Sequence, residues 1–215
     1  MSKTAFSAIG IERLRVFCDG EGITTLVAGY GCPLRCRYCL NPQCFAAGKP
    51  AKTYEVSQLI DEVAVDDLYF QATGGGVVFG GGEPLLQADF IHAFRRLCSP
   101  QWKVYLESSL SVPREELEKV VDDIDHFLID IKDMDPEIYQ NYTGKENTEL
   151  LKNLQLLAER GYQDKVTVRI PLIPGYNTQK AQEHSRERLE TMGFRSFDLF
   201  SYEVEHALNK RKQIK

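Results

Sequence analysis

Short apolar runs alternate along this chain with segments in which apolar residues recur every three or four positions. The short runs predict six β-strands, over residues 23–31, 76–84, 103–109, 126–132, 165–175 and 196–203. The segments between them have the period of amphipathic helices, over residues 57–70, 88–98, 113–124, 149–161 and 178–193. Strands and helices therefore follow one another from end to end, without a helix after the last strand.

This alternation predicts right-handed crossovers and a parallel sheet. Residues with reactive or charged side chains fall at or just past the carboxyl ends of the six strands: Cys32, Glu83, Glu107, Lys132, Arg169 and Glu203. A flat sheet, with about 4.8 Å between strands, would spread these side chains over more than about 20 Å. We therefore expect an α/β fold, a partial (β/α)6 TIM-like barrel of parallel strands with outer helices. It should form a single domain over residues 1–215, with its core at about 19–203.

Composition excludes some classes of function. With 43% apolar and 27% charged residues the chain has ordinary material for a core, and its net charge of −5 argues against nucleic-acid binding. No apolar run approaches the roughly 20 residues of a membrane helix, and the first residues do not resemble a signal peptide. We expect a cytoplasmic monomer that keeps its thiols reduced.

The segment GCPLRCRYCLNPQC, residues 31–44, holds four of the six cysteines. Cys32, Cys36 and Cys39 are spaced C-x3-C-x2-C. Structural zinc sites usually take four ligands in two separated pairs, which this spacing does not resemble. Three thiolates on a four-iron cluster leave one iron open to another ligand, and the spacing favours this metal site. Cys44 as a fourth ligand would close a zinc site or an electron-transfer cluster, and both alternatives stay open.

The spacing C-x3-C-x-aromatic-C, with Tyr38 as the aromatic residue, resembles the hallmark of the radical S-adenosylmethionine superfamily. Four further stretches resemble its glycyl-radical-enzyme activating enzymes, of the pyruvate formate-lyase activating type: DGEGI, GGGEPLLQ, IDIKDMDPEIYQNYTG and VRIPLIPGYN. The resemblance runs from about residue 19 to residue 203. It implies one [4Fe–4S] cluster and S-adenosylmethionine as cofactors.

The resemblance also implies an activity. Reductive cleavage of S-adenosylmethionine would give a 5′-deoxyadenosyl radical that removes a Cα hydrogen from a glycine of a partner glycyl radical enzyme. Flavodoxin or ferredoxin would supply the electron. Two alternatives remain: a radical S-adenosylmethionine enzyme acting on a small molecule, like 7-carboxy-7-deazaguanine synthase, or a non-enzymatic zinc-binding module.

Particular positions carry the implied site. Cys32, Cys36, Cys39 and Lys132 are the expected catalytic residues. The expected cofactor-binding residues are Tyr38, Asn41, Gly81, Gly82, Glu83, Glu107, Ser109, Asp130, Lys132, Arg169 and Glu203. In GGGEP, residues 80–82 would let a ligand approach the backbone closely. Asp130 and Lys132, two apart on a strand, point to the same face, with a simple buried ion pair as the alternative. Arg169 can bind a carboxylate or be an ordinary edge arginine.

Asp19, Gly20 and Gly22 in DGEGI are expected to face the substrate glycine. Glu21 and Thr24 stand where related sequences carry proline and arginine. Near the last strand, relatives read P-Y-H, whereas here Glu203 follows Tyr202. Glu203 or His206 would replace the missing histidine contact.

Overall fold

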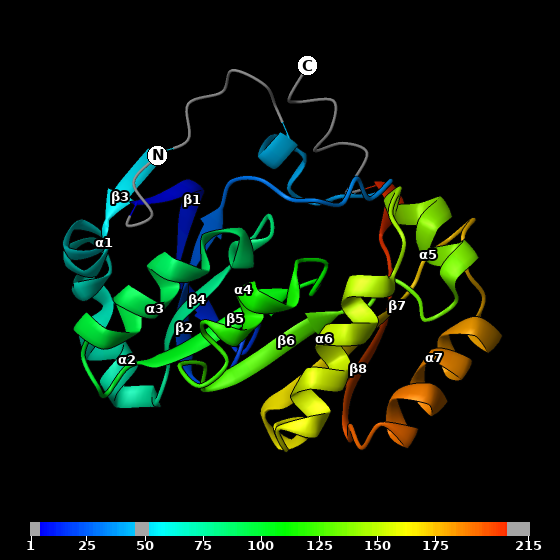
Figure 1. Ribbon diagram of the computed structural model, residues 1–215. Helices are drawn as coiled ribbons and strands as arrows, with labels where there is room; N and C mark the ends of the chain where they lie inside the picture. The colour runs from blue at the N-terminus through cyan, green and yellow to red at the C-terminus, as the bar shows by residue number, and fades with distance from the viewer. Residues whose placement is uncertain (1–4, 46–51, 206–215) are drawn as a thin grey trace. The chain divides into compact units, whose positions relative to one another are not determined.

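The computed structural model describes residues 5–45 and 52–205 (Figure 1). Eight strands are hydrogen-bonded in the order β3-β1-β2-β4-β5-β6-β7-β8. Their bounds are β1 Ala5–Val16, β2 Ile23–Gly29, β3 Lys52–Glu55, β4 Gly76–Gly81, β5 Lys103–Ser108, β6 His126–Asp130, β7 Val166–Leu172 and β8 Ser196–Ser201. β2, β4 and β5 pair in parallel, as do β7 and β8. The expected α/β fold and its six strands are confirmed.

Two strands were not predicted. β1 pairs antiparallel with both β2 and β3, at one edge of the sheet. Only the first part of β1 buries alternate residues, and the remainder is half-exposed or exposed. Because β3 has four residues and a single buried side chain, Tyr54, its apolar pattern is too short to be recognised.

The helices are α1 Val56–Val63, α2 Asp67–Thr73, α3 Ala88–Leu97, α4 Arg114–Glu118, α5 Pro136–Thr143, α6 Thr148–Glu159 and α7 Gln179–Thr191. Short 3-10 helices are η1 Pro42–Phe45, η2 Ala64–Asp66, η3 Pro84–Gln87 and η4 Gln163–Lys165. The helix expected over 57–70 is thus divided into α1, η2 and α2. The one expected over 113–124 ends at Glu118 and continues as turns, in which Val120 and Asp123 donate to carbonyls three residues back.

Helix α5 was not predicted, although local signals define both of its ends. The Asp135 carboxylate accepts from the backbone N–H groups of Glu137 and Ile138, and Pro136 occupies the first turn. Gly144 ends the helix with φ +77°, a conformation that suits glycine. With eight residues and two buried tyrosines, α5 is too short for its periodicity to identify it.

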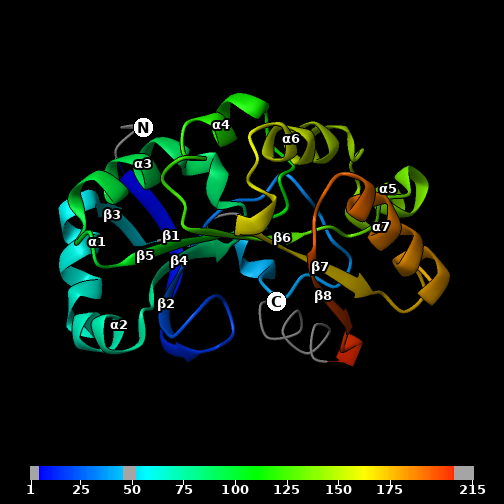
Figure 2. The same ribbon diagram turned by 90° about the horizontal axis from the view of Figure 1, so that it is seen from below.

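The chain divides into two compact units. The first unit is Met1–Cys32, Gln43–Ser108 and Glu115–Leu128, and the second is Pro33–Pro42, Ser109–Arg114 and Ile129–Lys215. In the core of the first unit, the Phe6 ring lies 5.5 Å from that of Phe79 and 5.2 Å from that of Phe90 (centroid distances). In the second unit, α7 packs on β7 (Figure 2). The side chain of Gln182 donates to the carbonyl of Ile170 at 2.6 Å.

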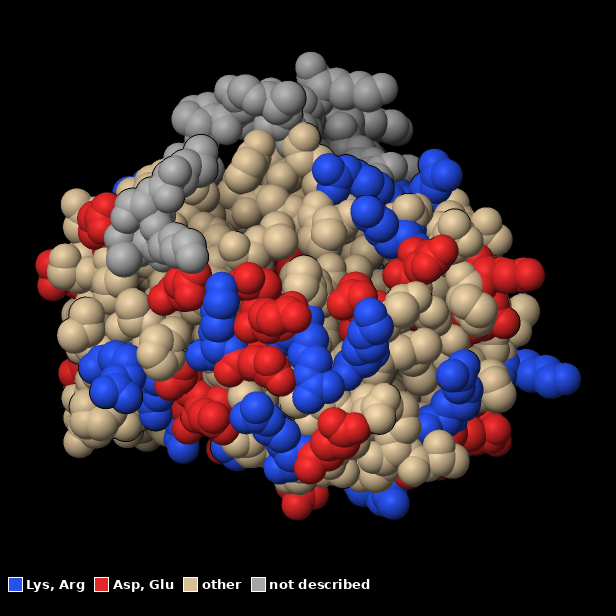
Figure 3. All heavy atoms as spheres, viewed as in Figure 1, with Lys and Arg blue, Asp and Glu red and all other residues tan. Residues whose placement is uncertain are grey.

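Charged side chains of both signs are interspersed on the face drawn in Figure 3. Within the described residues, no helix is long and apolar enough to cross a membrane.

Candidate active site

Apart from Asp19, Gly20 and Gly22, which precede β2, the predicted site residues of the first unit lie at or near the carboxyl ends of three parallel strands, β2, β4 and β5. In the register of β2 and β4, Gly29 lies opposite Gly81. Beyond these strand ends, the backbone N–H of Gly82 donates to Gly29 O at 3.0 Å, and that of Glu83 donates to Gly31 O at 2.8 Å. These two bonds hold the turn that leads to Cys32, which is half-buried.

The glycines of GGGEP are required by the packing of the protein itself. A Cβ on Gly82 would lie 2.2 Å from Gly31 O, and one on Gly81, where φ is +87°, would lie 2.7 Å from the Cβ of Ala28. A Cβ on Gly80 would meet the Glu107 carboxylate at 2.7 Å, so Glu107 lies directly over this glycine. The sequence predicts glycines here to leave space for a ligand, whereas the atoms that exclude a side chain belong to neighbouring strands and to the turn after β2.

Glu83 is completely buried, and its carboxylate bonds to protein groups. Its Oε1 accepts from the hydroxyl of Ser108 at 2.7 Å and from the backbone N–H of Leu85 at 3.3 Å, which caps η3. Sequence reasoning selected Ser109 in LESS and missed Ser108. Ser109 belongs to the second unit, where its hydroxyl accepts from the N–H of Ser111 at 3.5 Å.

DGEGI forms a tightly packed turn between β1 and β2. Asp19 is buried and binds the guanidinium of Arg15 through both carboxylate oxygens. The hydrogen bond that Arg15 donates to Asp19 raises the pKa of Arg15 above its ordinary value. A Cβ on Gly20 would lie 2.6 Å from the Tyr105 ring, and one on Gly22 would lie 2.5 Å from Thr73 O. The packing of this turn therefore requires both glycines.

The second unit contains residues 33–42, hereafter the cysteine loop, with Cys36 and Cys39. Cys36 is buried and Cys39 is half-buried, and the N–H of Cys39 donates to Cys36 O at 3.3 Å. Burial raises the pKa of Cys36 to about 11, against an opposing effect of Lys132 and with a further increase from Cys39 and Asp130. Without a metal this thiol is therefore protonated at neutral pH, and a metal that binds it displaces the proton.

Asp130, Lys132 and Arg169 form an ion triad close to Cys36. Asp130 Oδ1 accepts from Arg169 Nε at 2.6 Å, and Oδ2 accepts from Lys132 Nζ at 3.0 Å. Burial alone would raise the pKa of Asp130, but Arg169 and Lys132 lower it to about 2. Burial opposes the charge of Lys132, yet Asp130 holds the pKa of this lysine well above its ordinary value. Two cations and one anion leave the triad with a net positive charge, which suits an anionic ligand.

Tyr38 of the cysteine loop belongs to a group of four packed tyrosines, with Tyr142, Tyr176 and Tyr202. The Tyr38 ring lies 6.1 Å from that of Tyr142 and 5.7 Å from that of Tyr176, and Tyr142 and Tyr176 are 5.1 Å apart (centroid distances). Tyr202 lies 6.5 Å from Tyr142. Sequence reasoning selected Tyr38 alone. Tyr202, in the expected P-Y-H position, was a signal for a second member of the group.

The remaining predicted residues are less enclosed. Asn41 is half-buried, and Glu203 is exposed just beyond β8. His206 lies outside the described residues. Cys44 is buried in η1 of the first unit.

The cysteines fit a [4Fe–4S] cluster by the chemistry of their donor atoms. None of the six takes part in a disulfide. Within residues 5–45 and 52–205, no three His, Cys, Asp or Glu side chains converge closely enough to hold a single metal ion. A cluster does not require such convergence, because each thiolate binds a different iron. Cys36 and Cys39 lie close enough for one to affect the pKa of the other.

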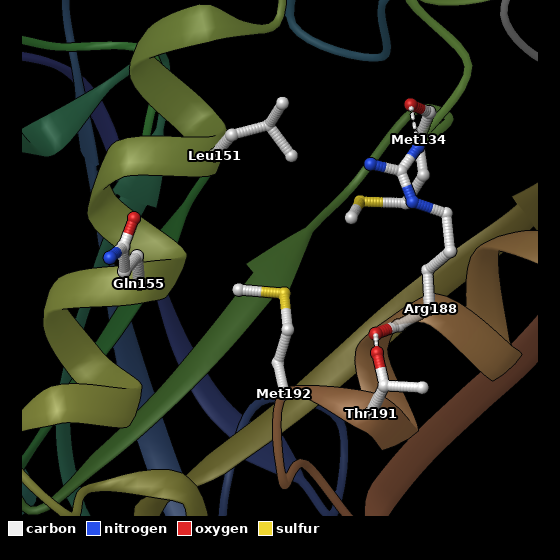
Figure 4. A pocket seen from close by; sticks show the side chains of 6 residues that line it. All are labelled: Met134, Leu151, Gln155, Arg188, Thr191 and Met192. Atoms are coloured by element: carbon white, nitrogen blue, oxygen red, sulfur yellow. Dashed lines mark hydrogen bonds between the residues drawn. The ribbon is translucent and has the colours of Figure 1, made fainter.

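A pocket of about 390 Å³ lies between α6 and α7 of the second unit (Figure 4). Its lining residues are Met134, Leu151, Gln155, Arg188, Thr191 and Met192. Arg188 donates to Met134 O at 2.9 Å across one side of it. Since none of the predicted site residues lines it, this pocket is not part of the candidate active site.

Comparison with known proteins identifies the family. The model of the radical SAM superfamily matches residues 26–187. The (2S)-3-sulfopropanediol dehydratase activating enzyme of Klebsiella oxytoca is 31% identical, over 78% of this chain and 71% of its own length. The pyruvate formate-lyase-activating enzyme of Staphylococcus aureus is 34% identical, over 75% of this chain and 66% of its own length.

Solved structures agree with this assignment. A domain of a pyruvate-formate lyase-activating enzyme from Bacteroides vulgatus matches with a TM-score of 0.53 at 30% identity, over 66% of this chain and 92% of that domain. SuiB of Streptococcus suis bound to S-adenosylmethionine matches with a TM-score of 0.64 over 82% of this chain and 40% of that one. At 14% identity, this second likeness concerns the fold alone.

The chain belongs to the radical S-adenosylmethionine superfamily. It is an enzyme of that superfamily, with a [4Fe–4S] cluster and S-adenosylmethionine as its cofactors. Among the relatives it most resembles in sequence are the activating enzymes of glycyl radical enzymes.

Proposed function

We propose that this protein activates a glycyl radical enzyme by removing a Cα hydrogen from a glycine of that partner. The two curated relatives, both activating enzymes by name, support the proposal. The chain spans about two thirds to 71% of their length. The partner, the electron donor (flavodoxin or ferredoxin) and the organisation as one domain all belong to the proposal.

The cofactors would supply the chemistry itself: the bound cluster would provide the electron for cleavage of S-adenosylmethionine, and the radical so formed would take the glycine hydrogen. The protein binds, orients and excludes water. Cys32, Cys36 and Cys39 would each hold one iron, and the fourth iron would stay open for S-adenosylmethionine. Asp19, Gly20 and Gly22 would form the rigid turn presented to the partner.

The observation that carries the cofactor assignment is the ion triad beside Cys36. Its net positive charge lies a short distance from a proposed cluster ligand, where the carboxylate of S-adenosylmethionine would bind. Lys132 and Arg169 both donate to Asp130, and an incoming carboxylate would share these donors. Glu107 would bind polar groups of the nucleoside.

Electron paramagnetic resonance provides the test of the activase proposal. The reduced protein is incubated anaerobically with S-adenosylmethionine and a glycyl radical enzyme encoded in the same genome. We expect a doublet of a glycine-centred radical on the partner. S-adenosylmethionine cleavage without this doublet, across all such partners, would contradict an activase and favour a small-molecule substrate.

Two cysteine variants test the open cluster. Cys36→Ala should lose the cluster and all cleavage of S-adenosylmethionine, because a missing thiolate releases one iron. Cys44→Ala is the matched control, since Cys44 is also buried and follows the loop closely in sequence, and this variant should keep the iron and sulfide content of the wild type. Loss of the cluster in Cys44→Ala would mean that Cys44 is a fourth ligand and that no iron is open.

A further inference from the structure

The cysteine loop is bound to the carboxyl end of α5 on both sides of Cys36. The N–H of Arg35 donates to Thr143 O at 2.8 Å, and the N–H of Arg37 donates to Tyr142 O at 3.1 Å. The last carbonyls of a helix have no partner within the helix. Two of those of α5 are satisfied here by the loop, so the position of Cys36 depends on the end of this helix.

This end of α5 is well ordered by its own contacts. The N–H of Gly144 donates to Gln140 O at 2.8 Å, which closes the helix. The hydroxyl of Thr143 donates to Tyr139 O at 2.8 Å and accepts from the N–H of Lys145 at 3.2 Å. The loop is therefore bound to a helix end with little conformational freedom.

The side chain of Tyr142, like its carbonyl, contacts the cysteine loop, through the ring of Tyr38. It is fully buried, with its ring against those of Tyr38, Tyr176 and Tyr202. Within the described residues its hydroxyl is buried and has no hydrogen-bond partner of normal geometry. Burial raises the pKa of this hydroxyl. Tyr202 raises it further, in part through a weak hydrogen-bonding interaction, and so does Cys36, whereas Lys132 lowers it. The hydroxyl is therefore a protonated donor near Tyr202 and Cys36 that makes no hydrogen bond of normal geometry, which is unusual for a buried polar group.

We propose that Tyr142 is a positioning residue for the cysteine loop, and that its hydroxyl donates a hydrogen bond to the sulfur of Cys36 in the cluster-loaded protein. The proposal rests on the ligand role of Cys36 but not on the identity of the partner enzyme. A hydrogen bond to a ligand sulfur stabilises the extra negative charge of the reduced cluster. Tyr142 thereby makes the reduction potential of the cluster less negative than it would otherwise be.

Tyr142→Phe removes the hydroxyl and keeps the ring and the backbone bond. The reduction potential of the reconstituted protein is measured by anaerobic titration, with the reduced cluster followed by electron paramagnetic resonance. We expect the reduction potential to become more negative by about 59 mV for this one-electron couple. At the wild-type midpoint, the ratio of reduced to oxidised cluster then falls about tenfold. Tyr142→Leu, which also loses the ring contacts, should in addition hold less iron.

Tyr176→Phe is the matched control, because Tyr176 belongs to the same group of rings but is half-buried. Its potential should equal that of the wild type. An unchanged potential and spectrum in Tyr142→Phe would overturn the proposal.

If Tyr142→Phe fails to hold iron, difluorotyrosine at position 142 keeps the ring and strengthens the donor. A less negative potential would then support the proposal, and no shift would refute it. No partner enzyme enters these measurements, so they are independent of the activase proposal.

Discussion

At the scale of single residues, Asp130 binds two cations at once, and this determines part of the response of the protein to acid. Its pKa in the folded protein, about 2, is below the ordinary value of 3.8, so its ionised form favours folding. The resulting stabilisation is fully present above about pH 4 and is lost as the pH falls toward 2. One pKa unit corresponds to about 1.4 kcal/mol, so the contribution is about 2 kcal/mol.

Asp130→Asn removes this charge and leaves Lys132 and Arg169 without their anion. We expect the free energy of unfolding of the apoprotein at pH 7 to fall by about 2 to 4 kcal/mol, as for a broken buried ion pair. The difference from the wild type should shrink between pH 4 and pH 2, measured by urea unfolding. Asp61→Asn, at an exposed position of α1, is the control and should change little. A difference that stays constant with pH would contradict the assigned role of the ionised carboxylate.

At the scale of elements, α5 lies in the stretch IDIKDMDPEIYQNYTG, which resembles activating enzymes, and its carboxyl end binds the cysteine loop. The segments around α5 also contact one another. Asp133 accepts from Asn177 Nδ2 at 3.1 Å and from Ser185 Oγ at 3.2 Å, so the stretches IDIKDMDPE and VRIPLIPGYN are joined through one buried carboxylate. Both stretches therefore have a packing role in the second unit, besides any contact with a ligand.

Gly144 and Gly161 permit a test of α5 as the support of the cysteine loop. Both follow a helix and have positive φ, +77° and +73°. Replacement by alanine should cost each protein about 1 to 2 kcal/mol of stability, because a side chain disfavours this conformation. Only Gly144→Ala should also lower the iron content after reconstitution, since the strained residue follows Thr143, whose carbonyl accepts from the N–H of Arg35 in the loop. The added carbon itself would make only an ordinary contact with Arg35, at 3.9 Å. Equal iron loss in both variants would attribute the effect to stability alone.

At the scale of the whole molecule, β6 belongs to both compact units, because the first ends at Leu128 and the second resumes at Ile129. The hydrogen-bonded order of strands nevertheless runs without interruption from β3 to β8. We therefore expect the apoprotein to unfold in one cooperative transition. Calorimetry tests this, since the calorimetric and van't Hoff enthalpies should then agree. Two resolved transitions would mean that the units unfold independently.

The sequence by itself determined β2 and the five strands from β4 to β8, the spacing of the three cysteines and the placement of Glu83 and Glu107 at or near strand ends. Each of these depends on local periodicity or on a motif within a few neighbouring residues. The contact between Asp130 and Lys132 could be expected in this way, because residues two positions apart in an extended segment point to the same face, and Lys132 does donate to Asp130. Arg169, expected at a strand end, lies in the middle of β7.

Tertiary structure alone decided the partners of these residues. Arg169 reaches Asp130 across 39 positions of sequence, Ser108 reaches Glu83 across 25, and the cysteine loop binds a helix that begins about a hundred residues later. Edge strand β3 and helix α5 are too short for a recognisable period and are stabilised by what they pack against. Contacts of this kind depend on which segments the fold brings together, and no local pattern records that.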